Sequence, residues 1–415
     1  MTLVSELELP AFDYTDPSLR GDSYHAAMAE LRATGWLARG PWGYMVLDRE
    51  SAEFFLRSRA ATFPGMKIAE IFDVREGPLY EQMRRNILHV NGPDHARLRG
   101  LLNPALSPRA VERYRPAMRA FLEQLLAAVA DEGRCEFVEA FAKPYPSLTI
   151  ATVMGAPLED APRLHHWSNW IQRQFDAASM ASEREQIELA VEQFYGYAAE
   201  LLRARRDDPR DDLLSMLIEA EEAGDRLSDV ECINLVFNVL AGGVDTTQSQ
   251  LAHTVRLLAE NPEQWQLLVD DPELAQAAVD EALRFEPITP FTARMTTEEL
   301  VYRDVTFPEG TIVMVCAFTG NRDLAPDERG AGGVGGVGEF NTFDITAARG
   351  RARELTFGAG VHYCVGANLA RVELREALSF LARHVRDLEL DGEPAFESIT
   401  GIYGLAELPL RFTVV

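Results

Sequence analysis

The stretch Phe357-Gly-Ala-Gly-Val-His-Tyr-Cys-Val-Gly-Ala-Asn-Leu-Ala-Arg371 carries the strongest structural signal in the chain. It places one cysteine, Cys364, in a glycine-punctuated loop that leads into a strong helical pattern. Glycines allow the backbone to bend tightly and to approach a flat ligand. The free N–H groups and the positive dipole end of the following helix stabilise a thiolate. Because a soft anionic sulfur suits iron, we interpret Cys364 as an iron ligand, the alternative being a buried free cysteine.

The residues around Cys364 form a longer pattern, Phe-Gly-x-Gly-x-His-x-Cys-x-Gly, with six matched positions. This pattern resembles the haem-ligand loop of the cytochrome P450 family. The resemblance implies haem b as the cofactor and Cys364 as its axial thiolate. The other cofactor-binding positions that it implies in this loop are Phe357, Gly358, His362 and Gly366.

Composition and charge narrow the class of protein. Of 415 residues, 47% are hydrophobic and 25% charged, as in ordinary globular proteins. The formal charge of −25 argues against nucleic acid as a partner, because phosphates require a basic surface. The four cysteines are scattered, so neither a disulfide framework nor a zinc cluster is expected. With no apolar run of about 18 residues and no signal peptide, we expect a cytoplasmic protein without a membrane anchor.

Hydrophobic periodicity predicts a mainly α fold in one domain spanning 1–415, with helices over about 93–286 and 364–384. Strand patterns appear at about 36–62 and 294–317, and a hairpin is expected near the C-terminus. The resemblance implies the cytochrome P450 fold, a large helical domain with a smaller β-rich part near the N-terminus. The polar run from Arg205 to Asp212 is interpreted as a solvated corner.

The predicted helix over 227–260 contains an unusual segment, Leu240-Ala-Gly-Gly-Val-Asp-Thr-Thr247. Each glycine costs about 1 kcal/mol in a helix interior, so the pair requires a reason. Small residues allow another group to approach the backbone closely, and the Asp-Thr-Thr side chains can interrupt the hydrogen bonds of the helix. The alternative is a local kink. The segment resembles the oxygen-binding helix of the family, which implies Asp245 and Thr246 as the catalytic acid–alcohol pair and Gly242 beside the haem.

Three basic side chains are candidates for the haem propionates. His95 and Arg99, at i and i+4, share one face of a predicted helix. The resemblance implies that both reach the propionates, and that Arg294 does so from the start of a strand. The alternatives are a solvated pair and an ordinary edge-strand charge.

The motif Glu281-Ala-Leu-Arg284 is weak by itself, because i,i+3 ion pairs are common on exposed helices. Its order between the acid–alcohol helix and the cysteine loop matches the family, which implies a structural pair behind the haem. The family's usual third arginine is replaced by Thr342, with Arg329 as a possible substitute upstream. Together with the glycine tract at 330–338, this raises the question of how firmly haem is held.

The candidates for a substrate pocket are mostly apolar, which predicts an apolar small molecule such as a steroid, terpenoid, fatty acid, aromatic or polyketide. The alternative for the candidates between 66 and 72 is that they pack on the core, and for those at 402 and 403 that they pack in a surface hairpin. The candidates are Met66, Ile68, Ile71, Phe72, Leu240, Val244, Ile288, Phe291, Ile402 and Tyr403.

The resemblance implies a monooxygenase of secondary metabolism that inserts one oxygen atom of O2 into this substrate. The sequence shows no flavin or iron–sulfur domain, so electrons are expected from a separate ferredoxin and an NAD(P)H-dependent ferredoxin reductase. Three alternatives remain: a peroxide-driven peroxygenase, a non-catalytic haem sensor or carrier, and a degenerate protein without haem. The candidate docking arginines for a ferredoxin are Arg97, Arg109, Arg113, Arg351 and Arg353.

Overall fold

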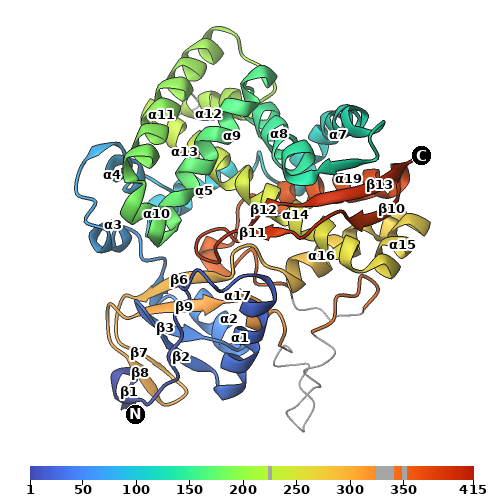
Figure 1. Cartoon of the computed structure of the whole chain (residues 1–415). Coiled ribbons are helices and arrows are strands. Elements are labelled where there is room, and N and C mark those ends of the chain that lie inside the picture. Colours follow the sequence, from blue (N-terminus) through green and yellow to red (C-terminus); the bar gives the residue numbers. More distant parts are fainter. Residues whose placement is uncertain (223–226, 324–340, 348–352) are drawn as a thin grey trace. The chain divides into compact units, whose positions relative to one another are not determined.

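The computed structural model describes residues 1–222, 227–323, 341–347 and 353–415, with the side chains of 221 and 222 excepted. The chain divides into two compact units. Unit 1 comprises 1–64, 280–364 and 396–404, and unit 2 comprises 65–279, 365–395 and 405–415. Helices predominate, which confirms the predicted mainly α class (Figure 1). The glycine tract, Arg329 and Arg351 lie outside the described residues.

Unit 1 holds the β-rich part that the strand patterns predicted. A five-stranded sheet has the order β2-β3-β9-β6-β4, in which β3 and β9 are parallel, and a three-stranded sheet has the order β1-β8-β7. Val313 and Val315 of β9 pack with Phe55 and Phe307 in the core of this unit. The strands are β1 (Thr2–Leu3), β2 (Leu37–Gly40), β3 (Gly43–Val46), β4 (Ala61–Thr62), β6 (Phe291–Thr296), β7 (Leu300–Tyr302), β8 (Val305–Phe307) and β9 (Ile312–Cys316).

Helices accompany these sheets, and the first α-helix, α1, buries Tyr24 and Met28. Helix α16 begins in unit 2 and ends in unit 1, carrying the Glu281–Arg284 motif in its last turns. The helices are η1 (Val4–Glu6), α1 (Gly21–Thr34), α2 (Arg49–Arg57), α16 (Ala275–Phe285), α17 (Ala317–Gly320) and η7 (Gly360–His362).

Unit 2 is mainly helical, with a three-stranded sheet of order β10-β13-β5. Its first part contains α3 (Lys67–Ile71), α4 (Gly77–Met83), α5 (Gly92–Leu102), α6 (Pro108–Val111), η2 (Glu112–Tyr114), α7 (Arg115–Val129), β5 (Arg134–Glu136), the π-helical turn η3 (Val138–Ala142), α8 (Pro144–Met154) and η4 (Leu158–Asp160). Its middle contains α9 (Ala161–Gln172), η5 (Arg173–Phe175), α10 (Ala177–Ser182), α11 (Arg184–Asp207), α12 (Leu213–Glu222), α13 (Asp229–Gly243), α14 (Asp245–Glu260), α15 (Pro262–Asp270) and η6 (Pro272–Leu274).

The last part of unit 2 begins with the helix that the sequence predicted after Cys364. It contains α19 (Ala367–His384), β10 (Val385–Leu390), β12 (Leu405–Glu407) and β13 (Pro409–Val414). Strand β11 (Ala395–Phe396) crosses from unit 2 into unit 1, and the hairpin that follows is closed in unit 1 where Glu397 N donates to Gly404 O at 3.0 Å.

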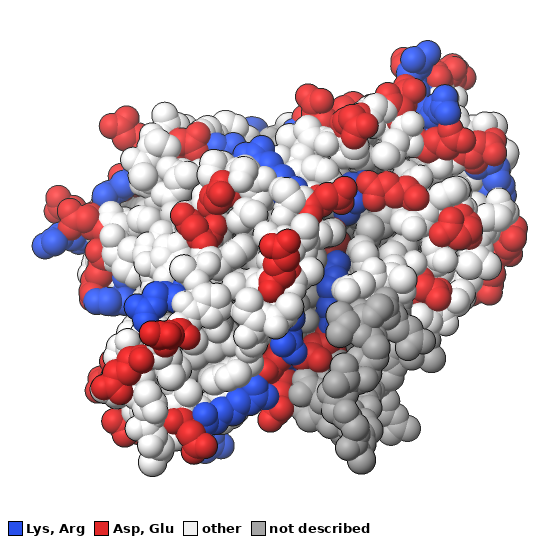
Figure 2. Space-filling model, turned by 60° about the horizontal axis from the view of Figure 1, so that its bottom comes forward, with Lys and Arg blue, Asp and Glu red and all other residues white. Residues whose placement is uncertain are grey.

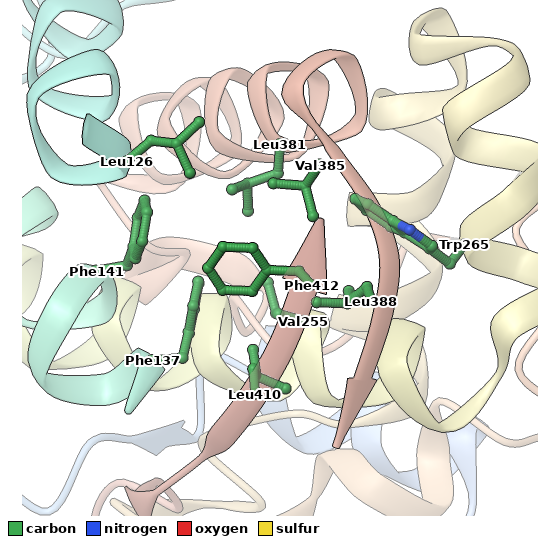
Figure 3. Close-up of a pocket in the computed structure, with 10 residues that line it drawn as sticks. All are labelled: Leu126, Phe137, Phe141, Val255, Trp265, Leu381, Val385, Leu388, Leu410 and Phe412. Atoms are coloured by element: carbon green, nitrogen blue, oxygen red, sulfur yellow. The ribbon is translucent and has the colours of Figure 1, made fainter. Parts of the chain in front are cut away.

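A hydrophobic cavity lies inside unit 2, where α7, η3, α14, α15 and α19 meet β10 and β13 (Figure 3). The ring of Phe412 projects into the middle of these side chains. The lining residues are Leu126, Phe137, Phe141, Val255, Trp265, Leu381, Val385, Leu388, Leu410 and Phe412. Because the lining is apolar, this cavity belongs to the packing of the core rather than to a polar site.

Many charged side chains are engaged in ion pairs. Acidic and basic side chains are interspersed over the described part of the face drawn in Figure 2. The interpretation of 205–212 as a solvated corner was wrong for its two ends, because Arg205 and Asp212 are buried and pair at 2.8 Å. Gly155 makes this possible, since a Cβ there would lie 2.0 Å from Asp212 Oδ2. Within the described ranges, every helix is too short or too polar to span a bilayer.

Candidate active site

The loop before Cys364 has the tight backbone that its glycines predicted. Gly358 and Gly360 take the left-handed conformation, with φ of 70° and 73°. A Cβ on Gly360 would lie 2.4 Å from the carbonyl oxygen of Leu56, so only glycine fits there. The N–H of Cys364 donates to the carbonyl of Phe357 at 2.9 Å and closes the loop. Cys364 is half-buried and forms no disulfide, as a ligand thiol requires.

The Glu281–Arg284 pair is buried in unit 1, with exposed fractions of 4% and 7%. Arg284 Nε and Nη2 donate to the two carboxylate oxygens of Glu281 at 2.7 and 2.8 Å. The segment containing Thr342 joins through its backbone. Arg284 Nη2 donates to the Thr342 carbonyl at 3.1 Å, and the N–H of Asp344 donates to Glu281 Oε1 at 3.0 Å. Main-chain groups therefore contact both members of the pair at the place where the family has an arginine.

Asn321 connects this pair to the cysteine loop, and sequence reasoning missed it. Its carbonyl accepts from Arg284 Nη1 at 3.4 Å, and its Oδ1 accepts from the N–H of Leu355 at 2.6 Å. Gly358 N in turn donates to Leu355 O at 2.7 Å. No side-chain pattern in the sequence distinguishes this asparagine, because all three of these bonds use main-chain atoms.

Arg294 is a buried cation on β6, only 2% exposed. Its Nη1 donates to the carbonyl of the adjacent Ala293 at 2.9 Å, and within the described residues it makes no ion pair. Burial lowers the pKa of Arg294 to about 10. A buried guanidinium in this state is stabilised by an anionic ligand, and a propionate carboxylate has the required charge and shape. The site therefore fits the haem that the cysteine loop implies.

His95 and Arg99 lie on α5, where the sequence predicted a helix that carries both. His95 is 5% exposed, and Arg99 is half-buried. Burial, and then the charge of Arg99, lower the pKa of His95 below its usual value. His95 is therefore a neutral hydrogen-bonding group near pH 7, and Arg99 supplies the charge.

The predicted opening of the long helix is present. Helix α13 ends at Gly243 and α14 begins at Asp245, with Val244 at the junction. The two glycines differ in their surroundings. A Cβ on Gly243 would lie 2.4 Å from Ile150 Cδ1, whereas a Cβ on Gly242 would meet no atom within 4 Å. Gly243 therefore permits helix packing, and Gly242 faces open space.

The acid and the alcohol beside this opening make different contacts. The hydroxyl of Thr246 donates to the carbonyl of Gly242 at 2.6 Å. Asp245 is 5% exposed, and its Oδ2 accepts from the hydroxyl of Ser168 on α9 at 3.1 Å. Gln172, one turn further along α9, donates from Nε2 to the carbonyl of Ala241. Sequence reasoning missed both α9 residues, because helical periodicity does not show which helix a polar face meets.

The pocket candidates fall into two groups by exposure. Met66, Ile68, Phe72, Phe291 and Ile402 are half-buried, and Ile71 on α3 is 40% exposed. Leu240, Val244, Ile288 and Tyr403 are buried. Tyr403 has contacts within unit 1 that account for its burial, since its hydroxyl accepts from Gly21 N at 2.9 Å and its N–H donates to Ile288 O at 2.7 Å.

Comparison with known proteins identifies the family to which the chain is similar. The family described as "Cytochrome P450" matches residues 45–325. Luteothin monooxygenase of Streptomyces thioluteus is 34% identical over 98% of this chain and 96% of its own length. Mycinamicin IV hydroxylase/epoxidase of Micromonospora griseorubida is 33% identical, with 75% of each chain covered. The crystal structure of CalO2 superposes with a TM-score of 0.88 and 29% identity over 98% of this chain and 99% of that one.

The family match ends before the cysteine loop, but the matches to luteothin monooxygenase and CalO2 each cover 98% of this chain. Both named relatives are oxygenating enzymes, and the fold of CalO2 covers both units. The predicted family, fold and enzyme class are thus confirmed: the chain belongs to the cytochrome P450 family of haem-thiolate monooxygenases.

Proposed function

We propose that the chain binds haem b through Cys364 and inserts one oxygen atom of O2 into an apolar small molecule. The observation that carries the reaction type is the opening between α13 and α14. There, Gly242 faces open space beside the Thr246 hydroxyl and the buried Asp245 carboxyl. When bound, the haem would supply reductive activation of O2 and oxygen transfer, which the protein's own groups cannot perform.

The protein's residues would then bind, orient and move protons. Cys364 provides an anionic sulfur ligand, and Arg294, with His95 and Arg99, provides the charge and donors for the propionates. For proton delivery, the Thr246 hydroxyl releases the Gly242 carbonyl and donates from Oγ1. The ionised carboxylate of Asp245 then takes up a proton from solvent and passes it to Thr246 through water. Haem retention rests on the Glu281–Arg284 pair, whose contacts reach the cysteine loop through Asn321.

The substrate class is proposed from the pocket candidates, which are almost all apolar. The names of relatives support a small organic substrate, since they include a mycinamicin IV hydroxylase/epoxidase, a vitamin D(3) 25-hydroxylase and a polyketide biosynthesis enzyme. We place the reaction in secondary metabolism in the cytoplasm. Spectral shifts on addition of compounds from each predicted class would identify the ligand.

Electrons are proposed to come from a ferredoxin and its NAD(P)H-dependent reductase. Two of the candidate docking arginines are already paired, Arg97 with Glu231 and Arg113 with Asp211. Arg109 and Arg353 are therefore the better candidates for contact with an acidic partner. Product formation with ferredoxin, reductase and NADPH, but not with peroxide alone, supports this proposal, whereas turnover on peroxide alone would indicate a peroxygenase.

The ferrous–CO spectrum tests the haem ligand. The wild-type protein should show the Soret band of a thiolate-ligated haem, and Cys364→Ala should abolish it. Cys135→Ala is the matched control, because Cys135 is also half-buried and burial raises the pKa of its thiol to about 12. An unchanged band in Cys364→Ala would overturn the assignment.

A second experiment tests the proton delivery. Thr246→Ala should keep the CO band and the binding of substrate, but divert electrons from product to peroxide, because the hydroxyl that protonates oxygen is gone. Thr247→Ala, at a buried neighbour, is the control. Equal product per NADPH in wild type and Thr246→Ala would remove Thr246 from the mechanism.

A further inference from the structure

Three polar side chains of α9 face the helix opening, those of His165, Ser168 and Gln172. They are spaced at i, i+3 and i+7, so they lie on one face of the helix. The nearest is Ser168, which is fully buried. Its hydroxyl lies 3.1 Å from Asp245 Oδ2 and 3.4 Å from the carbonyl of Leu240. The shorter contact is to the carboxyl group. A hydrogen bond to a charged acceptor is also the stronger of the two kinds, so Asp245 is the principal acceptor.

The other two side chains hold the helix ends on either side of Asp245. Gln172 donates to the Ala241 carbonyl, which lies near the end of α13. His165 Nε2 lies 2.9 Å from Gln248 Oε1, in the first turn of α14. Helix α9 thus holds the chain on both sides of the opening, and Ser168 contacts Asp245 between these two points.

We propose that Ser168 is a positioning residue for Asp245, whose hydrogen bond fixes one carboxyl oxygen against α9 and so directs proton transfer through the other. This inference rests on the proposed role of Asp245 in proton delivery. In the buried setting of Asp245, loss of this donor disfavours the ionised carboxylate and frees the side chain to rotate. Both effects would slow the return of protons to Thr246.

The decisive variant is Ser168→Ala, measured as product formed per NADPH against pH. Coupling should fall, and the acid limb of the profile should move to higher pH by about one to two units, because the lost hydrogen bond stabilised the ionised carboxylate. Ser168→Thr, which restores the hydroxyl, should return the acid limb to its wild-type position. A serine with a merely structural role would lower the melting temperature and leave the acid limb in place.

Two control variants isolate the contact. Ser147 is 1% exposed, and its hydroxyl donates to the Lys143 carbonyl at 2.7 Å, so Ser147→Ala removes a buried hydroxyl that touches no carboxylate. His165 is the titratable group on the same face of α9 as Ser168. Burial lowers its pKa, the hydrogen bond to Gln248 opposes this, and Lys143, Glu139 and His166 act on it electrostatically. The shift caused by Ser168→Ala should persist in a His165→Gln background.

A measurement without turnover tests the same contact. Melting temperatures of the haem-bound protein should show a loss in Ser168→Ala that is absent when Asp245→Ala has already removed the acceptor. If Ser168→Ala retains no haem, Ser168→Cys keeps the volume with a weaker donor and gives the same comparison. Equal melting losses in both backgrounds, or an unmoved acid limb, would overturn the proposal. Failure of the proposed function would appear instead as a wild type with no CO band or product.

Discussion

At the scale of single residues, Arg294 gives the clearest indication of an anionic ligand, because it is buried without an ion pair among the described residues. We predict opposite effects of Arg294→Met on the two forms of the protein. The haem-free form should become more stable, since a buried charge is removed. The haem-bound form should lose haem to apomyoglobin about tenfold faster, because a charge-assisted bond is worth about 1.5–3 kcal/mol.

Arg294→Lys is the control for this prediction. It keeps the charge but lacks the planar fork that matches a carboxylate, so its haem loss should fall between wild type and Arg294→Met. Wild-type retention of haem in Arg294→Met would show that the residue binds no propionate.

The role of Thr342 is also decided at the scale of single residues. Its carbonyl accepts from Arg284, and any residue provides that group. Thr342→Ala should therefore change stability by less than about 0.5 kcal/mol and leave the rate of haem loss unchanged. Glu281→Gln, which leaves Arg284 buried beside a neutral partner, should cost about 3 kcal/mol and accelerate haem loss. Thermal melts and haem transfer measure both, and a large loss in Thr342→Ala would show that its side chain matters.

At the scale of elements, α19 carries two buried carboxyl groups with opposite pH behaviour. Glu373 is 1% exposed, and burial raises its pKa well above 4.5. Burial also acts on Glu376, but hydrogen bonds from Arg119 and Arg115 outweigh it and lower the pKa of this carboxyl. Arg119 Nε donates to Glu376 Oε2 at 2.6 Å, and Arg115 donates to the other oxygen.

The direction in which each substitution changes stability with pH follows from these pKa shifts. Above pH 4.5 the unfolded chain loses the Glu373 proton and the native protein keeps it, so this group's contribution to stability falls as pH rises. Glu373→Gln should thus gain stability relative to wild type with rising pH, by up to about 1.4 kcal/mol per unit. Glu376→Gln should cost about 3 kcal/mol at pH 7, and its penalty should shrink below pH 4.5. Urea melts from pH 3 to 8 measure both, and parallel curves would contradict the assignment.

The sequence predicted the elements whose signals lie within a short stretch of the chain. The cysteine loop, α5, α19 and the opening at Val244 depend on glycines and helical periodicity within a short stretch. The contacts of Ser168 and Asn321 join segments far apart in the sequence or use main-chain atoms. The Arg205–Asp212 pair is close in sequence, but it packs against the distant Gly155. A run of charges looks the same on a solvated corner as around a buried pair, so only the fold distinguishes them.

At the scale of the whole molecule, the formal charge of −25 opposes the compact state. Individual ion pairs compensate locally, as where Arg303 joins Asp48 at 2.6 Å and Glu50 at 2.8 Å, and both signs are interspersed on the face drawn in Figure 2. Salt weakens such pairs but also screens the repulsion among the excess acids. The repulsion acts over longer distances, so we expect it to dominate the response to salt at neutral pH.

Raising NaCl from about 0.01 to 0.3 M at pH 7.5 should therefore raise the melting temperature by several degrees, because the screening length contracts from about 30 Å to below 10 Å. The same titration at pH 4.8, the isoelectric point, is the control. The net charge is close to zero there, so only the weakening of ion pairs remains and the shift should vanish or reverse. Calorimetry at both pH values measures the difference. A melting temperature that falls with salt at pH 7.5 would mean that the paired charges, rather than the excess acids, dominate the electrostatics of the fold.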